Sequence, residues 1–273
     1  MTTNEKKVVL VTGVSSGFGQ AIAAELDTRG YRVFGTTRKP SAAAPTGCTL
    51  VSMNVDDEGS VTAGVAEVLR HAGRIDAVVN NAGWGFAGAI EDTTVDEARR
   101  QFETNFFGMH RVCRAVLPQM RAQRSGRIVN MSSLGGIVSV PFQAMYCATK
   151  FAVEAYTEAL RMEVRPFGIQ VAMVEPGDFA TRFTANRLMT AASTPQSPYA
   201  ERCATAVRRM GEDESSNPDI GPVVRAVLTA LEARNARLRY PAANALQRTL
   251  VALRPLLPQP LFEYLVMDNY KVR

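Results

Sequence analysis

Short apolar runs alternate with longer amphipathic stretches along most of the chain. The runs are roughly four to eight residues long and rich in β-branched side chains, which is typical of buried parallel strands. Between them, apolar positions recur with the period of a helix. This alternation predicts an α/β domain built on a parallel sheet. The clearest predicted strands are Val8–Val11, Arg32–Thr37, Ile75–Val79, Arg127–Ser133 and Ile169–Val174.

A glycine-rich loop, Thr12 to Gly19, follows the first predicted strand, and a helical pattern follows the loop. Glycines permit positive φ and close approach, so backbone N–H groups and a helix N-terminus can hold a pyrophosphate there. The spacing is Gly-x3-Gly-x-Gly, which differs from the commonest dinucleotide fingerprint, Gly-x-Gly-x-x-Gly. Taken alone it also fits an ordinary glycine-rich turn. The flanking strand and helix favour a dinucleotide site.

Tyr146 and Lys150 are candidates for acid–base chemistry because their spacing places them on one face of a helix. A free tyrosine, with a pKa of about 10, is a poor acid or base at neutral pH. A cation roughly 4 Å away would interact by about 4 kcal/mol at an effective dielectric constant of about 20. We therefore expect Lys150 to lower the pKa of Tyr146 by about three units. Such pairs are common on solvated helices, but here Ser133 ends a predicted strand, where open α/β sheets bind ligands.

Several motifs, in order, resemble those of the short-chain dehydrogenase/reductase family. They are the glycine loop, the Asn80–Gly83 turn, Asn105, the Ser133, Tyr146 and Lys150 set, and Pro176-Gly177 with Thr181. The resemblance runs from about Lys7 to Thr181. It implies one doubly wound Rossmann domain, residues 1–273, with a seven-stranded parallel sheet and helices on both faces. It also implies four catalytic residues, Asn105, Ser133, Tyr146 and Lys150.

The resemblance further implies which residues contact the dinucleotide. They are Gly13, Ser15, Ser16, Gly17, Phe18, Gly19, Asn54, Val55, Asn81, Ala82, Gly83, Tyr146, Lys150, Pro176, Gly177 and Thr181. One departure lies at Asn54, where the family usually has an aspartate that recognises the adenine amine. Asparagine keeps an acceptor oxygen, so we expect adenine binding to persist.

The end of the second predicted strand favours NADP(H) over NAD(H). An NAD enzyme is expected to carry an acidic residue there for the ribose 2′-hydroxyl. Thr37 stands there instead, and Arg38 and Lys39 follow. A guanidinium and an ammonium suit a 2′-phosphate, which they can neutralise with charge-assisted hydrogen bonds. The alternative is that Arg38 is one more arginine of an arginine-rich chain.

These residues predict hydride transfer between nicotinamide and a carbonyl or secondary alcohol. Tyr146 would protonate the carbonyl oxygen and Ser133 would orient it. By resemblance, Lys150 would hold the ribose and Asn105 would position a water. The other hypothesis is a non-catalytic dinucleotide sensor of the same fold. A sensor has no need of all four side chains, so the enzyme is favoured.

Composition and charge argue against several other classes of function. The net charge is +5, but the basic residues are spread along the chain and are not gathered with aromatics, which argues against nucleic acid. The four cysteines and two histidines show neither disulfide nor metal spacing. No signal peptide or bilayer-spanning stretch is apparent. We expect a soluble cytoplasmic protein with no metal site.

The last third of the chain carries fewer motifs that indicate a structure or a function. Residues from about 185 to 215 suggest a substrate lid, although a plain surface loop fits as well. The stretch from about 241 to 273 is a C-terminal extension with leucines at helical spacing. It resembles the tails of hydroxysteroid and retinol dehydrogenase-like members, which implies an apolar substrate or peripheral membrane contact. We expect a pocket that is apolar apart from Ser133 and Tyr146.

A homodimer or homotetramer is also expected. By resemblance, association would use the predicted helices Asp96–Gln119 and Ala144–Arg165. Both carry large apolar side chains that a solitary domain would leave uncovered. They are Phe102, Phe106, Val112 and Val116 on the first, and Phe151, Val153, Tyr156 and Leu160 on the second.

Overall fold

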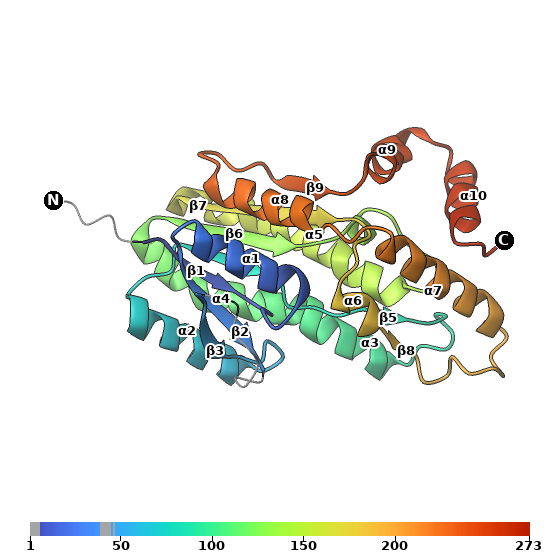
Figure 1. Cartoon of the computed structure of the whole chain (residues 1–273), viewed down its shortest axis with the longest axis horizontal. Coiled ribbons are helices and arrows are strands. Elements are labelled where there is room, and N and C mark those ends of the chain that lie inside the picture. The colour runs from blue at the N-terminus through green and yellow to red at the C-terminus, as the bar shows by residue number, and fades with distance from the viewer. Residues whose placement is uncertain (1–5, 39–44, 46) are drawn as a thin grey trace.

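The structure, a computed structural model, describes residues 6–38, 45 and 47–273. Seven parallel strands form its central sheet in the order β3-β2-β1-β4-β6-β7-β9 (Figure 1). Their bounds are β1 Val8–Val11, β2 Arg32–Thr37, β3 Thr49–Ser52, β4 Ala77–Asn80, β6 Gly126–Met131, β7 Ile169–Pro176 and β9 Arg239–Ala242. The strand order reverses between β1 and β4, which is the topological switch point of a doubly wound sheet. The predicted fold class is confirmed.

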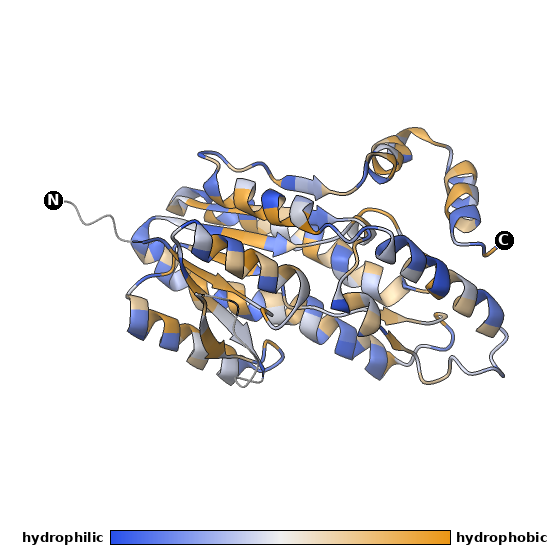
Figure 2. Cartoon of the chain, in the orientation of Figure 1, coloured by the Kyte–Doolittle hydropathy of each residue, from blue (hydrophilic) through white to orange (hydrophobic). Residues whose placement is uncertain are grey.

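Helices cover both faces of the sheet because side chains alternate along each strand. Val8 and Leu10 of β1 belong to one apolar cluster, whereas Val9 and Val11 belong to the other. The first cluster is closed by α2, α4 and α5, and the second by α1 and α8. Figure 2 shows the same apolar interior along the strands. The bounds of these helices are α1 Gly17–Thr28, α2 Glu58–Ala72, α4 Met109–Gln123, α5 Ala144–Val164 and α8 Gly221–Glu232.

The predicted helix from Asp96 to Gln119 is not one regular helix. α3, Val95–Phe102, begins at a capping box between Thr94 and Glu97. A π-helical segment, η1, Glu103–Gly108, joins it to α4. Such widened turns interrupt the regular backbone hydrogen bonds and are frequent at functional sites. Asn105 lies in this segment.

Half of the side chains predicted for subunit contact are in the core instead. Val112, Val116, Val153 and Leu160 are buried between their helices and the sheet. The helical period explains the error, because the stripe of apolar residues on each helix packs against the sheet. Phe102, Phe106, Phe151 and Tyr156 are only partly buried.

The region predicted as a lid is structured. α6 covers Arg182–Ala185, β8 covers Leu188–Met189, and α7 covers Ala200–Ser215. β8 pairs in parallel with β5, Phe86–Ala87, and residues 190–199 are the longest loop of this region.

The C-terminal extension follows β9 and lies beyond the edge of the sheet (Figure 1). It contains α9, Ala245–Leu253, the short turn η4, Arg254–Leu256, and α10, Gln259–Asn269. Its leucines are largely exposed, Leu246 to 69% and Leu256 to 78%. The remaining short turns are η2, Leu134–Gly136, and η3, Arg165–Phe167. Within the described ranges, no helix is both long and apolar enough to cross a membrane.

Candidate active site

A cleft of about 1340 Å³ opens at the carboxyl ends of the central strands. It is lined by the four predicted catalytic residues and by the predicted cofactor residues except Gly19. The parallel sheet explains this convergence, because the loops that follow its strands meet at one edge.

The glycine loop has the backbone that the sequence predicts. Gly13 and Gly17 have φ values of 71° and 59°, which side chains rarely tolerate. Gly19 lies beneath the loop, where a Cβ would come within 2.3 Å of the Gly13 carbonyl oxygen. Ser16 begins α1 without a side-chain cap, so the N–H groups of the first turn remain available to an anion.

Thr12 is a structural residue that the sequence argument did not single out. Its Oγ1 accepts hydrogen bonds from the backbone N–H groups of Asn81 and Ala82, at 2.9 and 3.0 Å. In return, Nδ2 of Asn81 donates to the carbonyl of Thr12 at 2.9 Å. These bonds tie the glycine loop to the turn after β4. Its position directly after β1 is the sequence feature by which Thr12 could have been found.

The far end of the cleft contains the residues predicted for adenine and its ribose. Arg38 follows β2, is exposed and lines the cleft, whereas Lys39 lies outside the described residues. The Oδ1 of Asn54 accepts from the backbone N–H of Asp56 at 3.3 Å. Asp56 also lines the cleft, and its buried Oδ1 has no hydrogen-bond partner among the residues described. This orphaned acceptor, which sequence reasoning missed, and the open N–H groups of α1 fit a dinucleotide.

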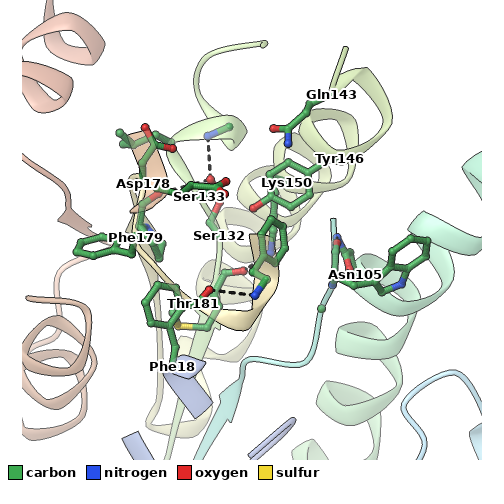
Figure 3. A pocket seen from close by; sticks show the side chains of 18 of the residues that line it. Phe18, Asn105, Ser132, Ser133, Gln143, Tyr146, Lys150, Asp178, Phe179 and Thr181 are labelled. Carbon is green, nitrogen blue, oxygen red and sulfur yellow. Dashed lines mark hydrogen bonds between the residues drawn. The ribbon is translucent and has the colours of Figure 1, made fainter. Parts of the chain in front are cut away.

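Ser133, Tyr146 and Lys150 gather where β6 meets α5 (Figure 3). Ser133 Oγ accepts from the N–H of Gly135 at 3.0 Å. A Cβ on Gly135 would lie 3.3 Å from the Tyr146 ring and 3.4 Å from Ser133 Oγ, so glycine lets these two approach. Lys150 Nζ lies 5.8 Å from the centre of the Tyr146 ring and donates to the carbonyl of Met131 at 2.8 Å.

The expected lowering of the Tyr146 pKa is wrong for this structure. Burial raises the pKa of the phenol well above its usual value, and a hydrogen bond with Ser133 opposes this only in part. The ring of Phe183 packs edge-on against that of Tyr146, at 5.5 Å. Lys150 is buried too, and burial lowers its pKa to about 8 while the charge of Glu154 raises it. Desolvation therefore outweighs the attraction on which the prediction relied.

Asn105 uses its side chain for structure. Its Oδ1 accepts from the N–H of Trp84 at 3.0 Å, and its Nδ2 donates to the Trp84 carbonyl at 3.0 Å. These bonds join the π-helical segment η1 to the turn after β4. Since the side chain is engaged, any water that Asn105 positions would contact its backbone.

The other side of the cleft is formed by the turn after β7. Pro176 and Gly177 line it, and Thr181 lies against the glycine loop, since a Cβ on Gly17 would be 3.5 Å from it. The rings of Phe18 and Phe179 meet edge to face at 5.8 Å across this boundary (Figure 3).

The cleft is less apolar than predicted. Apolar side chains line its outer part, among them Val138, Val140, Leu246, Leu250, Phe262 and Leu265. Charged groups also line it, namely Asp178, Arg209, Asp213 and Glu214. Burial, together with the neighbouring carboxylates, raises the pKa of Asp178 to about 6. The sequence could not show this wall because it forms only where α7, which carries Arg209, Asp213 and Glu214, packs beside Asp178 of the turn after β7.

The fold and the site together define a doubly wound α/β protein with a Ser, Tyr and Lys cluster at its switch point. The family model of the short chain dehydrogenases matches residues 7–191. The chain is 37% identical to a 3-ketodihydrosphingosine reductase of Bacteroides thetaiotaomicron, with 98% of this chain and 100% of that one covered. It is 33% identical to the uncharacterised oxidoreductase YusZ of Bacillus subtilis, with 94% and 96% covered.

Among solved structures, a short-chain dehydrogenase from Streptomyces avermitilis superposes with a TM-score of 0.82 at 35% identity. The match covers 99% of this chain and 98% of that one. The chain therefore belongs to the short-chain dehydrogenase family and is an oxidoreductase of that family.

Proposed function

We propose that the protein is an NADP(H)-dependent reductase of a ketone with a large apolar part, and in reverse a dehydrogenase of the secondary alcohol. One observation carries the proposal: Ser133, Tyr146 and Lys150 line the same cleft as the glycine loop and the apolar outer wall. A dinucleotide on the loop and a carbonyl at Tyr146 would thus share one enclosed space.

The roles of the side chains follow from their surroundings. When bound, the nicotinamide supplies the hydride that the carbonyl carbon receives. Tyr146 donates a proton to the carbonyl oxygen, and its raised pKa keeps the phenol protonated at neutral pH, as reduction requires. Ser133 hydrogen-bonds the same oxygen and fixes its position. The ammonium of Lys150 stabilises the phenolate that remains after the proton has left.

Arg38 supports the preference for NADP(H). It lines the cleft directly after β2, beside Thr37, which stands where an NAD enzyme is expected to carry an acidic residue. We expect Thr37→Asp combined with Arg38→Leu to shift the preference toward NADH, because repulsion replaces attraction at the 2′-phosphate. Titration of both cofactors against the parent and the double variant measures this. Arg100→Leu is the control, since Arg100 is an exposed arginine of the same cleft. A parent that binds NADH as tightly as NADPH overturns the preference.

The substrate class is proposed from the two walls of the cleft. The apolar outer wall favours a long hydrocarbon part, since burial contributes about 25 cal/mol per Å². The charged wall at Asp178 and Glu214 favours a polar group near the carbonyl. The similarity to a protein named as a 3-ketodihydrosphingosine reductase supports a ketone as the oxidised substrate.

A panel of ketones tests the substrate class. NADPH consumption is followed with 3-ketodihydrosphingosine, a long-chain ketone without polar substituents, and a short ketone. We expect kcat/KM to rise with the apolar area of the substrate and to be highest when a polar group lies beside the carbonyl. A protein that reduces short polar ketones best contradicts the proposed class.

A further inference from the structure

A cluster of charged side chains joins α5, which carries Lys150, to β7 and β9. Glu154 of α5 and Glu175 of β7 are only 6% and 2% exposed. Arg239 of β9 is the cation that pairs with both. Buried carboxylates are costly unless they are paired, so their presence beside a catalytic lysine calls for a physical reason.

Arg239 bridges the two carboxyl groups. Its Nε lies 3.0 Å from Oε1 of Glu175, and one terminal nitrogen lies 3.0 Å from Oε2 of Glu154. The same terminal nitrogen lies 2.5 Å from the carboxylate of Glu158, which is half exposed. Glu158 is one helical turn beyond Glu154, so the cluster extends from the buried interior to solvent.

Glu154 is the member of this cluster that faces Lys150. The two residues are four positions apart on α5, which places them on one face, one turn from each other. Gly136 makes room for this face, because a Cβ there would lie 3.1 Å from Cγ of Glu154 and 3.0 Å from the Lys150 carbonyl. Both side chains are buried, so their charges are poorly screened by water.

The charged and titratable groups around Lys150 come from three elements. Tyr146, Cys147 and Glu154 are on α5, Glu175 is on β7, and Arg239 is on β9. The charge of Glu154 is the attraction that raises the pKa of Lys150 against the effect of burial. Glu175 contacts Glu154, and burial beside that second carboxyl raises the pKa of Glu175 to about 7. Burial also raises the pKa of Glu154, against the opposing effects of a hydrogen bond with Ser132 and of the charge of Arg239.

We propose that Glu154 is a positioning residue that keeps Lys150 protonated, and that Arg239 holds Glu154 ionised for this purpose. The role in catalysis rests on the proposed reductase function, whereas the charge relation between the two side chains does not. The hydrogen bond of Lys150 to the Met131 carbonyl then holds an ammonium rather than a neutral amine.

The sequence makes a direct measurement practical, because the chain has only five lysines. In protein carrying carbon-13 in its lysine side chains, the signal of Lys150 is the one that Lys150→Arg removes. Its pKa is read from the chemical shift as the pH is raised. We expect Glu154→Gln to lower this pKa by about one unit or more, which is about a tenfold change in the protonation equilibrium.

Two variants serve as matched controls. Glu175→Gln and Glu158→Gln make the same chemical change and also remove a partner of Arg239, but neither residue lies one helical turn from Lys150 on α5, as Glu154 does. We expect each to shift the lysine pKa by less than half as much as Glu154→Gln. An equal shift in either variant would show that the whole cluster acts and overturn the assignment to Glu154.

Glu154→Asp keeps the negative charge and guards against a variant that fails to fold. We expect it to hold the Lys150 pKa closer to the parent value than to that of Glu154→Gln. If Glu154→Gln does not fold, Glu154→Asp decides the question: its shorter side chain moves the charge away from Lys150, so a slightly lower lysine pKa supports the coupling, and an unchanged or higher pKa overturns it. An unchanged pKa in folded Glu154→Gln also overturns it.

Activity provides a second measurement of the same relation. In ketone reduction, the alkaline limb of kcat/KM should move to lower pH in Glu154→Gln, by the amount seen for the lysine pKa. If Glu154→Gln shifts the lysine pKa but the parent protein reduces none of the ketones, the proposed function is contradicted, and the charge relation between Glu154 and Lys150 stands. If the alkaline limb of kcat/KM stays in place while the pKa of Lys150 shifts, Glu154 has no role in catalysis.

Discussion

At the scale of single residues, burial decides the chemistry of the site. Tyr146 is partly buried and Lys150 is buried, and desolvation pushes each toward its neutral form. For the tyrosine, the neutral form is the acid that ketone reduction needs. For the lysine, the neutral form cannot stabilise a phenolate. The ionised carboxylate of Glu154 therefore matters because it favours the ammonium form.

Tyr146→Phe keeps the ring and its contact with Phe183 but removes the transferable proton. We expect kcat/KM for ketone reduction to fall by about 10²- to 10⁴-fold, the usual contribution of a positioned acid. NADPH affinity, measured by fluorescence titration, should stay within about threefold of the parent. Activity within about tenfold of the parent would remove Tyr146 as the proton donor.

Glu175 should make stability depend on pH. Its pKa in the folded protein is raised from 4.5 to about 7, so the folded state holds a proton that the unfolded state releases in that range. Stability from this group is therefore full below the unfolded pKa and is lost as the pH rises through about 7. Glu175→Gln mimics the protonated form. Its Tm relative to the parent should rise between about pH 5 and pH 8, and a constant difference would contradict the raised pKa.

The convergence of the predicted site residues in one cleft could be foreseen from the sequence, but their electrostatics could not. Ser133 and Tyr146 follow from motif spacing and from the rule that strand ends meet at one edge. The direction of the Tyr146 pKa depends on which side chains enclose the phenol, and Phe183 comes from a different element. Asp56 was missed because an orphaned buried oxygen is a property of packing alone.

At the scale of elements, the alternation of strands and helices could be predicted from the sequence, because strands of a parallel sheet are buried on both faces and form apolar runs. The predicted strand Arg32–Thr37 has the same bounds in the structure. The π-helical segment around Asn105 was not readable, since its cause is a tertiary contact with the Trp84 backbone. The pairing of β8 with β5 was not predictable either, because the two strands are far apart in sequence, and a substrate lid at about 185–215 stays a prediction.

The glycine loop gives the sharpest test at this scale. In Gly19→Ala the new Cβ would lie 2.3 Å from the Gly13 carbonyl oxygen and 2.4 Å from Asn81 Nδ2, so the loop must shift. We expect NADPH affinity to fall by about tenfold or more, with a loss of stability of about 1–3 kcal/mol. Gly211→Ala in α7 is the control, since a Cβ there meets nothing closer than 3.9 Å. Parent-like affinity in Gly19→Ala would contradict the close packing.

At the scale of the whole molecule, a homodimer or homotetramer remains a prediction. The surface available for it is smaller than the sequence suggested, because Val112 and Val153 belong to the core. Phe107 and Met162 stay exposed, to 43% and 71%, on the segments that the resemblance assigns to assembly.

Light scattering at micromolar concentration should therefore give a mass at least twice that of the 29.7 kDa chain. Phe107→Glu combined with Met162→Glu should lower that mass, because buried apolar contacts would have to accept charges. Ile90→Glu is the control at a similarly exposed apolar residue elsewhere. A parent that scatters as a single chain would contradict the expected assembly.

Transfer of a hydride from NADPH to a ketone in this cleft can be followed directly, with NADPH that carries deuterium at the transferable position of the nicotinamide and with a long-chain ketone. We expect mass spectrometry to find one deuterium on the carbinol carbon of the alcohol product, and we expect Tyr146→Phe to bind the cofactor but to form little of this alcohol. Tight NADPH binding without any deuterated alcohol, across the ketone panel, would contradict the proposed reductase and favour a dinucleotide sensor.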